Sequence, residues 1–253
     1  ESEGRMSAAA IDRAPVGSRE IVPVYVWEVP VRLAHWLIAL SIAVLSATGL
    51  YLGHPFMTVP GPAEQSFVMG WAKVIHGYGS YVFACAFLMR LIWMFTGNHY
   101  SHWDKFLSHK PSRLRGFMPT VSFYSFLRDR PPSFVGHNPV ASSAYTLVYG
   151  LCAWQVITGL ILRGASADVS SVVHGFGAWA GVFGGLAMVR WFHHITMWLL
   201  IGFAVHHVYS AVLMASIEKN GTMDSIFSGY KWVPRHDLEA GPYRWNNKGT
   251  IDE

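Results

Sequence analysis

The stretch WFHHITMWLLIGFAVHHVYS, residues Trp191 to Ser210, combines two properties that rarely occur together. It is apolar and long enough for a helix to cross the hydrocarbon core of a membrane, which takes about 20 residues. It also carries two pairs of histidines, one near each end: His193 and His194, then His206 and His207. Ionisable residues inside a membrane segment are costly and mark functional sites that supply their partners. The stretch therefore predicts a membrane helix that binds a group through imidazole.

The composition of the whole chain also indicates a membrane protein. Of the 253 residues, 52% are hydrophobic and 13% are charged, whereas about 25% are charged in a typical soluble domain. We therefore expect a lipid bilayer around the chain and no nucleic acid as a partner. The two cysteines, Cys85 and Cys152, lie in apolar runs, and no C-x-x-C-H motif occurs. These features exclude covalent haem attachment and a thiolate metal site, so we interpret both as small core residues.

Four apolar segments predict an all-α membrane protein built as a four-helix bundle. The predicted spans cover approximately 32–53, 70–96, 139–163 and 191–217. We expect a mobile tail over residues 1–24, a four-helix transmembrane domain over 25–217, and a C-terminal tail over 218–253.

The distribution of basic residues predicts the orientation of these spans. Lysine and arginine are concentrated in the N-terminal tail, in the loop over 97–138 and in the C-terminal tail. By the positive-inside rule, these segments and both termini face the cytoplasm. The Gly-rich, fairly apolar loop over 164–190 then lies outside, where we expect an interfacial or half-buried helix. A fifth span there would place the basic C-terminal tail outside.

This topology assigns a depth to each histidine in the spans. His35 lies near the inner end of the first span, and His207 lies toward the inner side of the fourth. His76 and His193 lie near the outer ends of the second and fourth spans. The 14 positions from His193 to His207 correspond to about 21 Å of helix rise and return to within about 40° of the same face. The sequence therefore predicts two levels, each with histidines from two helices.

Two such pairs in a four-helix bundle suit two haems b, each bound through two neutral imidazoles. We predict His35 and His207 as ligands of the inner haem iron, and His76 and His193 as ligands of the outer haem iron. Gly49 lies 14 residues beyond His35, so it should face the outer ring at the level of His76 and give it room.

Other residues near the predicted rings suggest partners for propionates and for a quinone. Arg32 lies one turn before His35, and Arg90 lies 14 residues beyond His76, near the inner ring. Both are candidates for pairing with the anionic propionates, because a buried arginine needs such a partner. The candidates for a quinone pocket beside the inner haem are Trp36, His206, Tyr209 and His137. For His194 and His206 we favour a structural role with a backbone or propionate partner, or a ring near the quinone.

Several motifs resemble the b-type cytochrome subunit of membrane-bound nickel–iron hydrogenases, within the bacterial cytochrome b561, Ni-hydrogenase and formate dehydrogenase gamma-like family. The resemblance runs from about residue 25 to 231. The matching stretches are YVWEVPVRLAHWL (25–37), LMRLIWMFTGNHYS (88–101), VGHNPVA (135–141), VITGLIL (156–162), HHITMW (193–198), HHVYSA (206–211) and SGYK (228–231). Apolar segments match easily, so GNHYS, GHNP and SGYK are the more specific signals.

The resemblance implies two haems b, with ligands on the first, second and fourth spans at the four histidines proposed above. It implies an iron–sulfur small subunit of a Ni-Fe hydrogenase on the outer face, linked to the large subunit, and a quinone (menaquinone or ubiquinone) reduced near the inner haem. The chain would then be an electron-transfer subunit of a hydrogen:quinone oxidoreductase complex in the bacterial inner membrane. It carries no nickel-binding cysteine set, so we expect hydrogen activation in the partner.

Two alternatives stay open. The first keeps the haems and changes the partner to a formate dehydrogenase, a thiosulfate reductase or another periplasmic oxidoreductase. The second is a haem-free membrane anchor or a small transporter, although transporters often show broken helices and inverted repeats. A visible spectrum of the reduced protein distinguishes the second alternative from the others.

Overall fold

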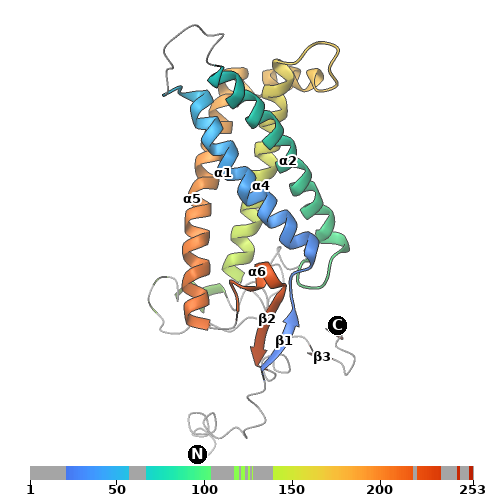
Figure 1. Ribbon diagram of the computed structural model, residues 1–253, viewed down its shortest axis with the longest axis vertical. Helices are drawn as coiled ribbons and strands as arrows, with labels where there is room; N and C mark the ends of the chain where they lie inside the picture. Colours follow the sequence, from blue (N-terminus) through green and yellow to red (C-terminus); the bar gives the residue numbers. More distant parts are fainter. Residues whose placement is uncertain are drawn as a thin grey trace, which may run out of the picture.

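The computed structural model describes residues 21–56, 67–103, 117–119, 121–122, 125, 127, 139–218, 221–234, 244–245 and 251–252. Its main feature is an up-and-down bundle of four long helices (Figure 1). These are α1 (Val29–Gly53), α2 (Val68–Thr96), α4 (Pro139–Ala165) and α5 (Leu186–Glu218). Each contains a segment long and apolar enough to cross a membrane, which confirms the prediction of four spans.

A small sheet lies at one end of the bundle, which we call the strand end (Figure 1). Strand β1 (Ile21–Tyr25) pairs antiparallel with β2 (Tyr230–Pro234), and Tyr25 lies opposite Tyr230. The four-residue helix α6 (Ser225–Ser228) precedes β2. The sequence analysis did not anticipate this sheet, since it assigned residues 21–24 to a mobile tail. The two strands are short and separated by most of the chain, so no local sequence pattern predicts their pairing.

The opposite end, which we call the loop end, carries the 3-10 helix η5 (His174–Phe183) (Figure 1). It corresponds to the half-buried helix expected in the loop over 164–190, and its Ala180 is buried between α4 and α5. Two glycines let backbones touch there. A Cβ on Gly164 would lie 2.4 Å from the carbonyl oxygen of Val173, and one on Gly177 would lie 2.7 Å from the nitrogen of Ala165. The Gly-rich composition of this loop therefore serves close backbone packing.

The start of α5 differs from the predicted span. Gly184 and Gly185 have φ values of 83° and 97°, a left-handed conformation that suits glycine. They form the turn after η5, and α5 begins at Leu186, earlier than the predicted start at Trp191. Arg190 lies within the first turns of this longer helix. Its side chain is exposed, so its charge can reach water and the helix can include it.

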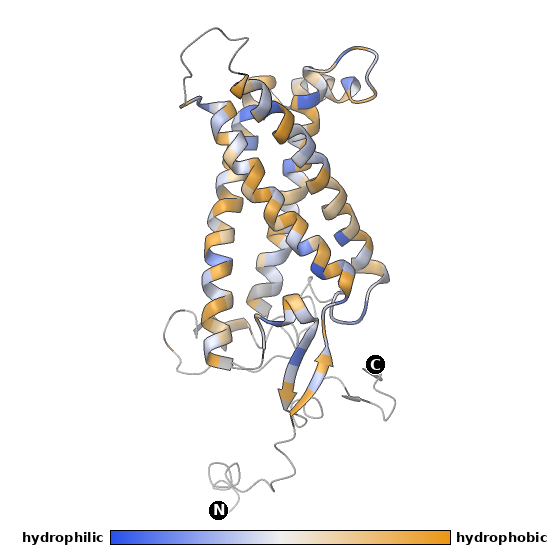
Figure 2. Cartoon of the chain, in the orientation of Figure 1, coloured by the Kyte–Doolittle hydropathy of each residue, from blue (hydrophilic) through white to orange (hydrophobic). Residues whose placement is uncertain are grey.

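The four helices associate as two pairs. Helix α1 packs mainly on α2, and α4 packs mainly on α5, whereas the two pairs touch each other sparsely. One small core, formed by Phe83, Phe87, Cys152 and Leu200, lies where they meet. Only 6% to 22% of the most apolar 18-residue stretch of each helix is buried inside the chain, and apolar residues recur along all four helices (Figure 2). Most of the apolar surface is therefore available to lipid or to a bound apolar group.

Candidate functional site

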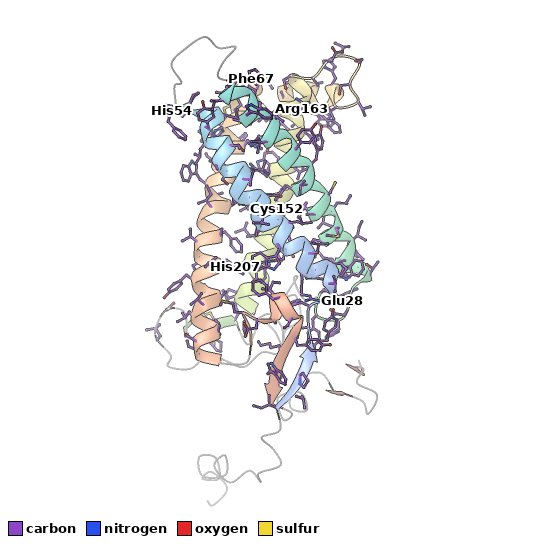
Figure 3. All side chains as sticks on the ribbon, viewed as in Figure 1. Glu28, His54, Phe67, Cys152, Arg163 and His207 are labelled. Atoms are coloured by element: carbon purple, nitrogen blue, oxygen red, sulfur yellow. The ribbon has the colours of Figure 1, made fainter. Side chains whose placement is uncertain are left out.

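The inner histidine pair comes from two different helices. His35 of α1 and His207 of α5 have ring centroids 6.2 Å apart and planes inclined by 59°. Figure 3 places His207 in the half of the bundle nearer the strand end. A metal–imidazole bond is about 2 Å long and the ring centre lies about 1 Å beyond the nitrogen, so two imidazoles on one metal have centroids about 6 Å apart. The spacing of this pair therefore fits a shared iron.

Aromatic side chains enclose this pair. Phe203 stacks on His207 with centroids 5.5 Å apart and planes inclined by 13°, and Tyr145 meets the same ring edge-on at 5.9 Å. Trp36 meets His35 edge-on at 5.2 Å. The Nδ1 atom of His35 is buried and has no hydrogen-bond partner among the described residues. A buried polar atom without a partner is costly, which indicates that a further group completes this site.

Two cationic side chains lie in the strand-end half of the bundle, as their sequence positions predicted. Arg32 donates from Nη1 to the carbonyl oxygen of Phe227, while its buried Nε atom has no hydrogen-bond partner in the described part of the chain. Arg90 is only 5% exposed, and its guanidinium lies over the ring of Tyr149, 5.6 Å from the centroid. Their roles toward haem propionates stay predictions.

His76 of α2 and His193 of α5 form the second predicted pair. Hydroxyl groups on the two remaining helices hold the rings. Oγ1 of Thr48 on α1 lies 2.9 Å from Nδ1 of His76, and Oγ1 of Thr158 on α4 lies 2.8 Å from Nδ1 of His193. The side-chain nitrogen of Gln155 lies 3.1 Å from Nε2 of His193. All four helices thus contribute to this level.

Glycines lie against both outer rings. A Cβ on Gly49 would lie 3.4 Å from Cε1 of His76, and a Cβ on Gly159 would lie 3.5 Å from Cε1 of His193. The predicted position of Gly49 at the level of His76 is therefore confirmed. A Cβ on Gly77, beside His76, would meet no atom within 4 Å. Small residues here leave room next to the imidazoles.

The remaining predicted residues have other surroundings. His194 lies within hydrogen-bonding distance of its own helix, with Nδ1 3.1 Å from the carbonyl oxygen of Arg190, in agreement with the structural role favoured for it. Of the quinone candidates, Trp36 contacts the inner pair, whereas His206 and Tyr209 are exposed on α5. His137 lies outside the described residues.

Two loop motifs of the family resemblance, GNHYS and SGYK, meet at the strand end, whereas residues 136–138 of GHNP lie outside the described residues. Oε2 of Glu28 accepts hydrogen bonds from Trp93 Nε1 at 2.8 Å, from the backbone nitrogen of Asn98 at 2.7 Å and from Ser101 Oγ at 3.4 Å. This carboxylate thus joins the start of α1 to the GNHYS segment that follows α2. Figure 3 shows Glu28 at this end of the bundle.

The SGYK segment completes the same cap. The carbonyl oxygen of Gly229 accepts hydrogen bonds from the backbone nitrogens of Val26 and Trp27 at 2.8 and 3.1 Å. The indole nitrogen of Trp27 donates to Ser225 Oγ at 3.1 Å. Trp36 also packs against Phe227, with centroids 4.8 Å apart and planes inclined by 33°. The segment before α1, the GNHYS segment and the SGYK segment, which are distant in sequence, therefore form one structure below the inner histidine pair.

Glu28, Thr48, Thr158 and Gln155 were not among the residues predicted from the sequence. A usable signal existed for the threonines, because the dipeptide Thr-Gly occurs in the first and third spans, at 48–49 and 158–159. The described residues contain no group of three or more His, Cys, Asp or Glu side chains that could hold a metal ion. Pairs of imidazoles suit haem iron, because the macrocycle supplies the other four ligands.

Comparison with known proteins finds a family model and several relatives. A family model described as "Prokaryotic cytochrome b561" matches residues 26–229. A "Probable Ni/Fe-hydrogenase B-type cytochrome subunit" of Cupriavidus necator is 34% identical over 231 residues, which cover 88% of this chain and 93% of the relative. The protein of the same name in Bradyrhizobium diazoefficiens is 34% identical over 233 residues, covering 90% and 94%. The "Probable Ni/Fe-hydrogenase 1 B-type cytochrome subunit" of Escherichia coli is 33% identical over 221 residues, covering 85% and 93%.

Proposed function

Because the chain belongs to the prokaryotic cytochrome b561 family, we propose that this b-type cytochrome is the membrane anchor and electron-transfer subunit of a Ni/Fe hydrogenase. Family membership and the four apolar helices make it a multi-pass membrane protein. The names of the relatives support the hydrogenase partner. In this proposal the chain connects the iron–sulfur small subunit, and through it the large subunit, to the quinone pool of a bacterial inner membrane.

The chain would bind two haems b, one at each histidine level. The observation that carries this proposal is the 6.2 Å separation of the His35 and His207 rings, which come from different helices. His76 and His193 would hold the second haem. Each haem supplies a one-electron iron couple. The helices hold the imidazoles in place, and the aromatic side chains around His207 keep water from the inner site.

The proposed orientation places the strand end in the cytoplasm. It is supported by the basic residues of the two tails and of the loop over 97–138, because positive charge favours the cytoplasmic side. The quinone would then bind near the inner pair, where Trp36 lies beside His35, and the hydrogenase would dock at the loop end.

The pairing of the histidines is testable by haem stoichiometry. The purified chain should contain two haems b, measured as the pyridine complex. Alanine at His35 or at His207 should remove one and the same haem, identified by its midpoint potential, and alanine at His76 or His193 should remove the other. His194→Ala serves as the control and should keep both. If His76→Ala and His207→Ala lose a common haem, the assigned levels are wrong.

The identity of the partner is testable in membranes that contain the whole complex. Hydrogen should reduce the haems, and the co-purifying subunits should include a Ni/Fe hydrogenase. Reduction of the haems by formate but not by hydrogen would identify the partner as a formate dehydrogenase. A co-purifying thiosulfate reductase would identify that enzyme as the partner. A colourless protein after expression with ample haem would support the haem-free anchor or transporter.

A further inference from the structure

The two outer histidines are held in the same way by threonines on neighbouring helices. The Thr48 hydroxyl donates to the carbonyl oxygen of Val44 at 2.8 Å, and the Thr158 hydroxyl donates to that of Trp154 at 2.8 Å. A hydroxyl carries a single proton, and each threonine uses it on its own helix, four residues back. With the proton on the backbone carbonyl, the oxygen accepts from the imidazole next to it.

This arrangement sets the tautomer of both rings. Nδ1 of His76 must carry the proton that Thr48 accepts, and Nδ1 of His193 must carry the one that Thr158 accepts, which leaves each Nε2 with a lone pair. The side-chain nitrogen of Gln155 lies 3.1 Å from Nε2 of His193, and this contact has to give way where Nε2 binds a metal. Neutral imidazole with a lone pair on Nε2 is a form that binds a metal.

Each threonine is followed by a glycine that faces the same ring. Gly49 follows Thr48 and lies against His76, and Gly159 follows Thr158. The hydroxyl fixes the Nδ1 side of the ring, and the missing side chain leaves space beside Cε1. Two Thr-Gly dipeptides on different helices thus repeat one arrangement, which points to a common purpose at this level.

One ring of the inner level, His35, differs in this respect. Nδ1 of His35 is buried and has no hydrogen-bond partner among the described residues. An acceptor on the Nδ1 proton raises the basicity of a metal-bound imidazole, and second-shell hydrogen bonding is one of the factors that set a haem potential. A more basic ligand stabilises the ferric state, so the level with these acceptors should have the lower potential.

We propose that Thr48 and Thr158 are positioning residues that fix the two outer histidines in their metal-binding tautomer and make the outer haem the one of lower potential. The proposal rests on the proposed function, since it requires a haem at each level. With this asymmetry, electron transfer from the outer level to the inner level is energetically downhill, in the direction from hydrogenase to quinone.

Valine substitutions test the proposal, because valine keeps the shape of threonine and removes the oxygen. Thr48→Val, Thr158→Val and the double variant would be made in the full chain, purified in detergent and titrated potentiometrically, with visible absorption as the readout. The outer haem should rise in potential, most in the double variant, while the inner haem stays unchanged. The His76→Ala variant, which keeps only the inner haem, identifies the two waves. The corresponding serine variants keep an acceptor and should stay near the wild type.

Haem retention gives a second readout if the valine variants load poorly. Loss of a second-shell partner typically weakens metal binding about 10–100-fold, so haem should be lost from the outer level alone and return with serine. Thr196→Val is the matched control, because this buried threonine also bonds back within its helix, to Phe192 at 2.8 Å, and forms no hydrogen bond to a histidine among the described residues. It should change neither haem.

Three outcomes would overturn the proposal. They are an unchanged potential of the outer haem in the double variant, an equal shift in the potentials of both haems, or loss of both haems from the Thr48 and Thr158 variants while the wild type keeps them. Failure of the proposed function gives a different result. In that case the wild-type chain itself binds no haem, or binds haem that hydrogen does not reduce in the whole complex.

Discussion

Replacing Glu28 by alanine should loosen the connection between α1 and α2 at the strand end. The carboxylate accepts two short hydrogen bonds, from Trp93 at 2.8 Å and from Asn98 at 2.7 Å, and a longer one from Ser101 at 3.4 Å. Trp93 and Asn98 belong to the end of α2 and the segment that follows it, whereas Glu28 precedes α1. In Glu28→Ala both short-bond donors lose their acceptor.

The magnitude follows from these bonds. A hydrogen bond to a charged group contributes about 1.5–3 kcal/mol, so two short ones contribute about 3–6 kcal/mol, and a bond at the length of the third adds little. Glu28 is half-buried, so water replaces part of what is lost, and we expect a loss near the lower figure, about 3 kcal/mol. Glu28→Gln keeps an acceptor without the charge and should lose about half as much.

The measurement is unfolding of the detergent-solubilised protein by added SDS, followed by tryptophan fluorescence. The expected order of stability is wild type, then Glu28→Gln, then Glu28→Ala. The haem content of the three proteins, measured before unfolding, separates a loss of stability from a loss of cofactor. If Glu28→Ala unfolds within about 0.5 kcal/mol of the wild type, the usual range of a surface substitution, the carboxylate does not join the two helices as described.

Two further substitutions test other parts of the structure. Gly177→Ala should destabilise the protein by about 1–3 kcal/mol in the same SDS assay, because its Cβ would lie 2.7 Å from the backbone nitrogen of Ala165. The control is Gly175→Ala in the same short helix, whose Cβ would meet no atom within 4 Å and which should be neutral. Equal effects of the two substitutions would contradict the backbone contact. Arg90→Gln should weaken retention of the inner haem about tenfold and lower its potential, because a buried positive charge favours the ferrous state; an effect confined to the outer haem would exclude the predicted propionate role.

The parts of the fold that the sequence predicts depend on regular spacing along the chain. Span length and composition give the four helices, and the helical repeat brings His193 and His207 onto one face. The same repeat places Gly49 at the level of His76. These inferences need only local geometry, because a helix that crosses a membrane has a known rise and rotation per residue.

The features that the sequence does not predict join residues distant in the chain. The contact of Thr48 with His76 depends on how α1 and α2 rotate against each other, and the three acceptor contacts of Glu28 depend on where the segment after α2 turns. The pairing of β1 with β2 has the same origin. Sequence reasoning assigned Glu28 to no role, because a single carboxylate beside a helix start gives no indication of its partners.

The pairing of β1 with β2 has a consequence for biosynthesis. The ribosome adds residues in order, so β1 has no partner until the nascent chain extends through Pro234, after all four helices have been made. The contact of Trp36 with Phe227 also waits for that moment. The sheet at the strand end can therefore form only after translation has passed Pro234, which makes its closure a late step of folding.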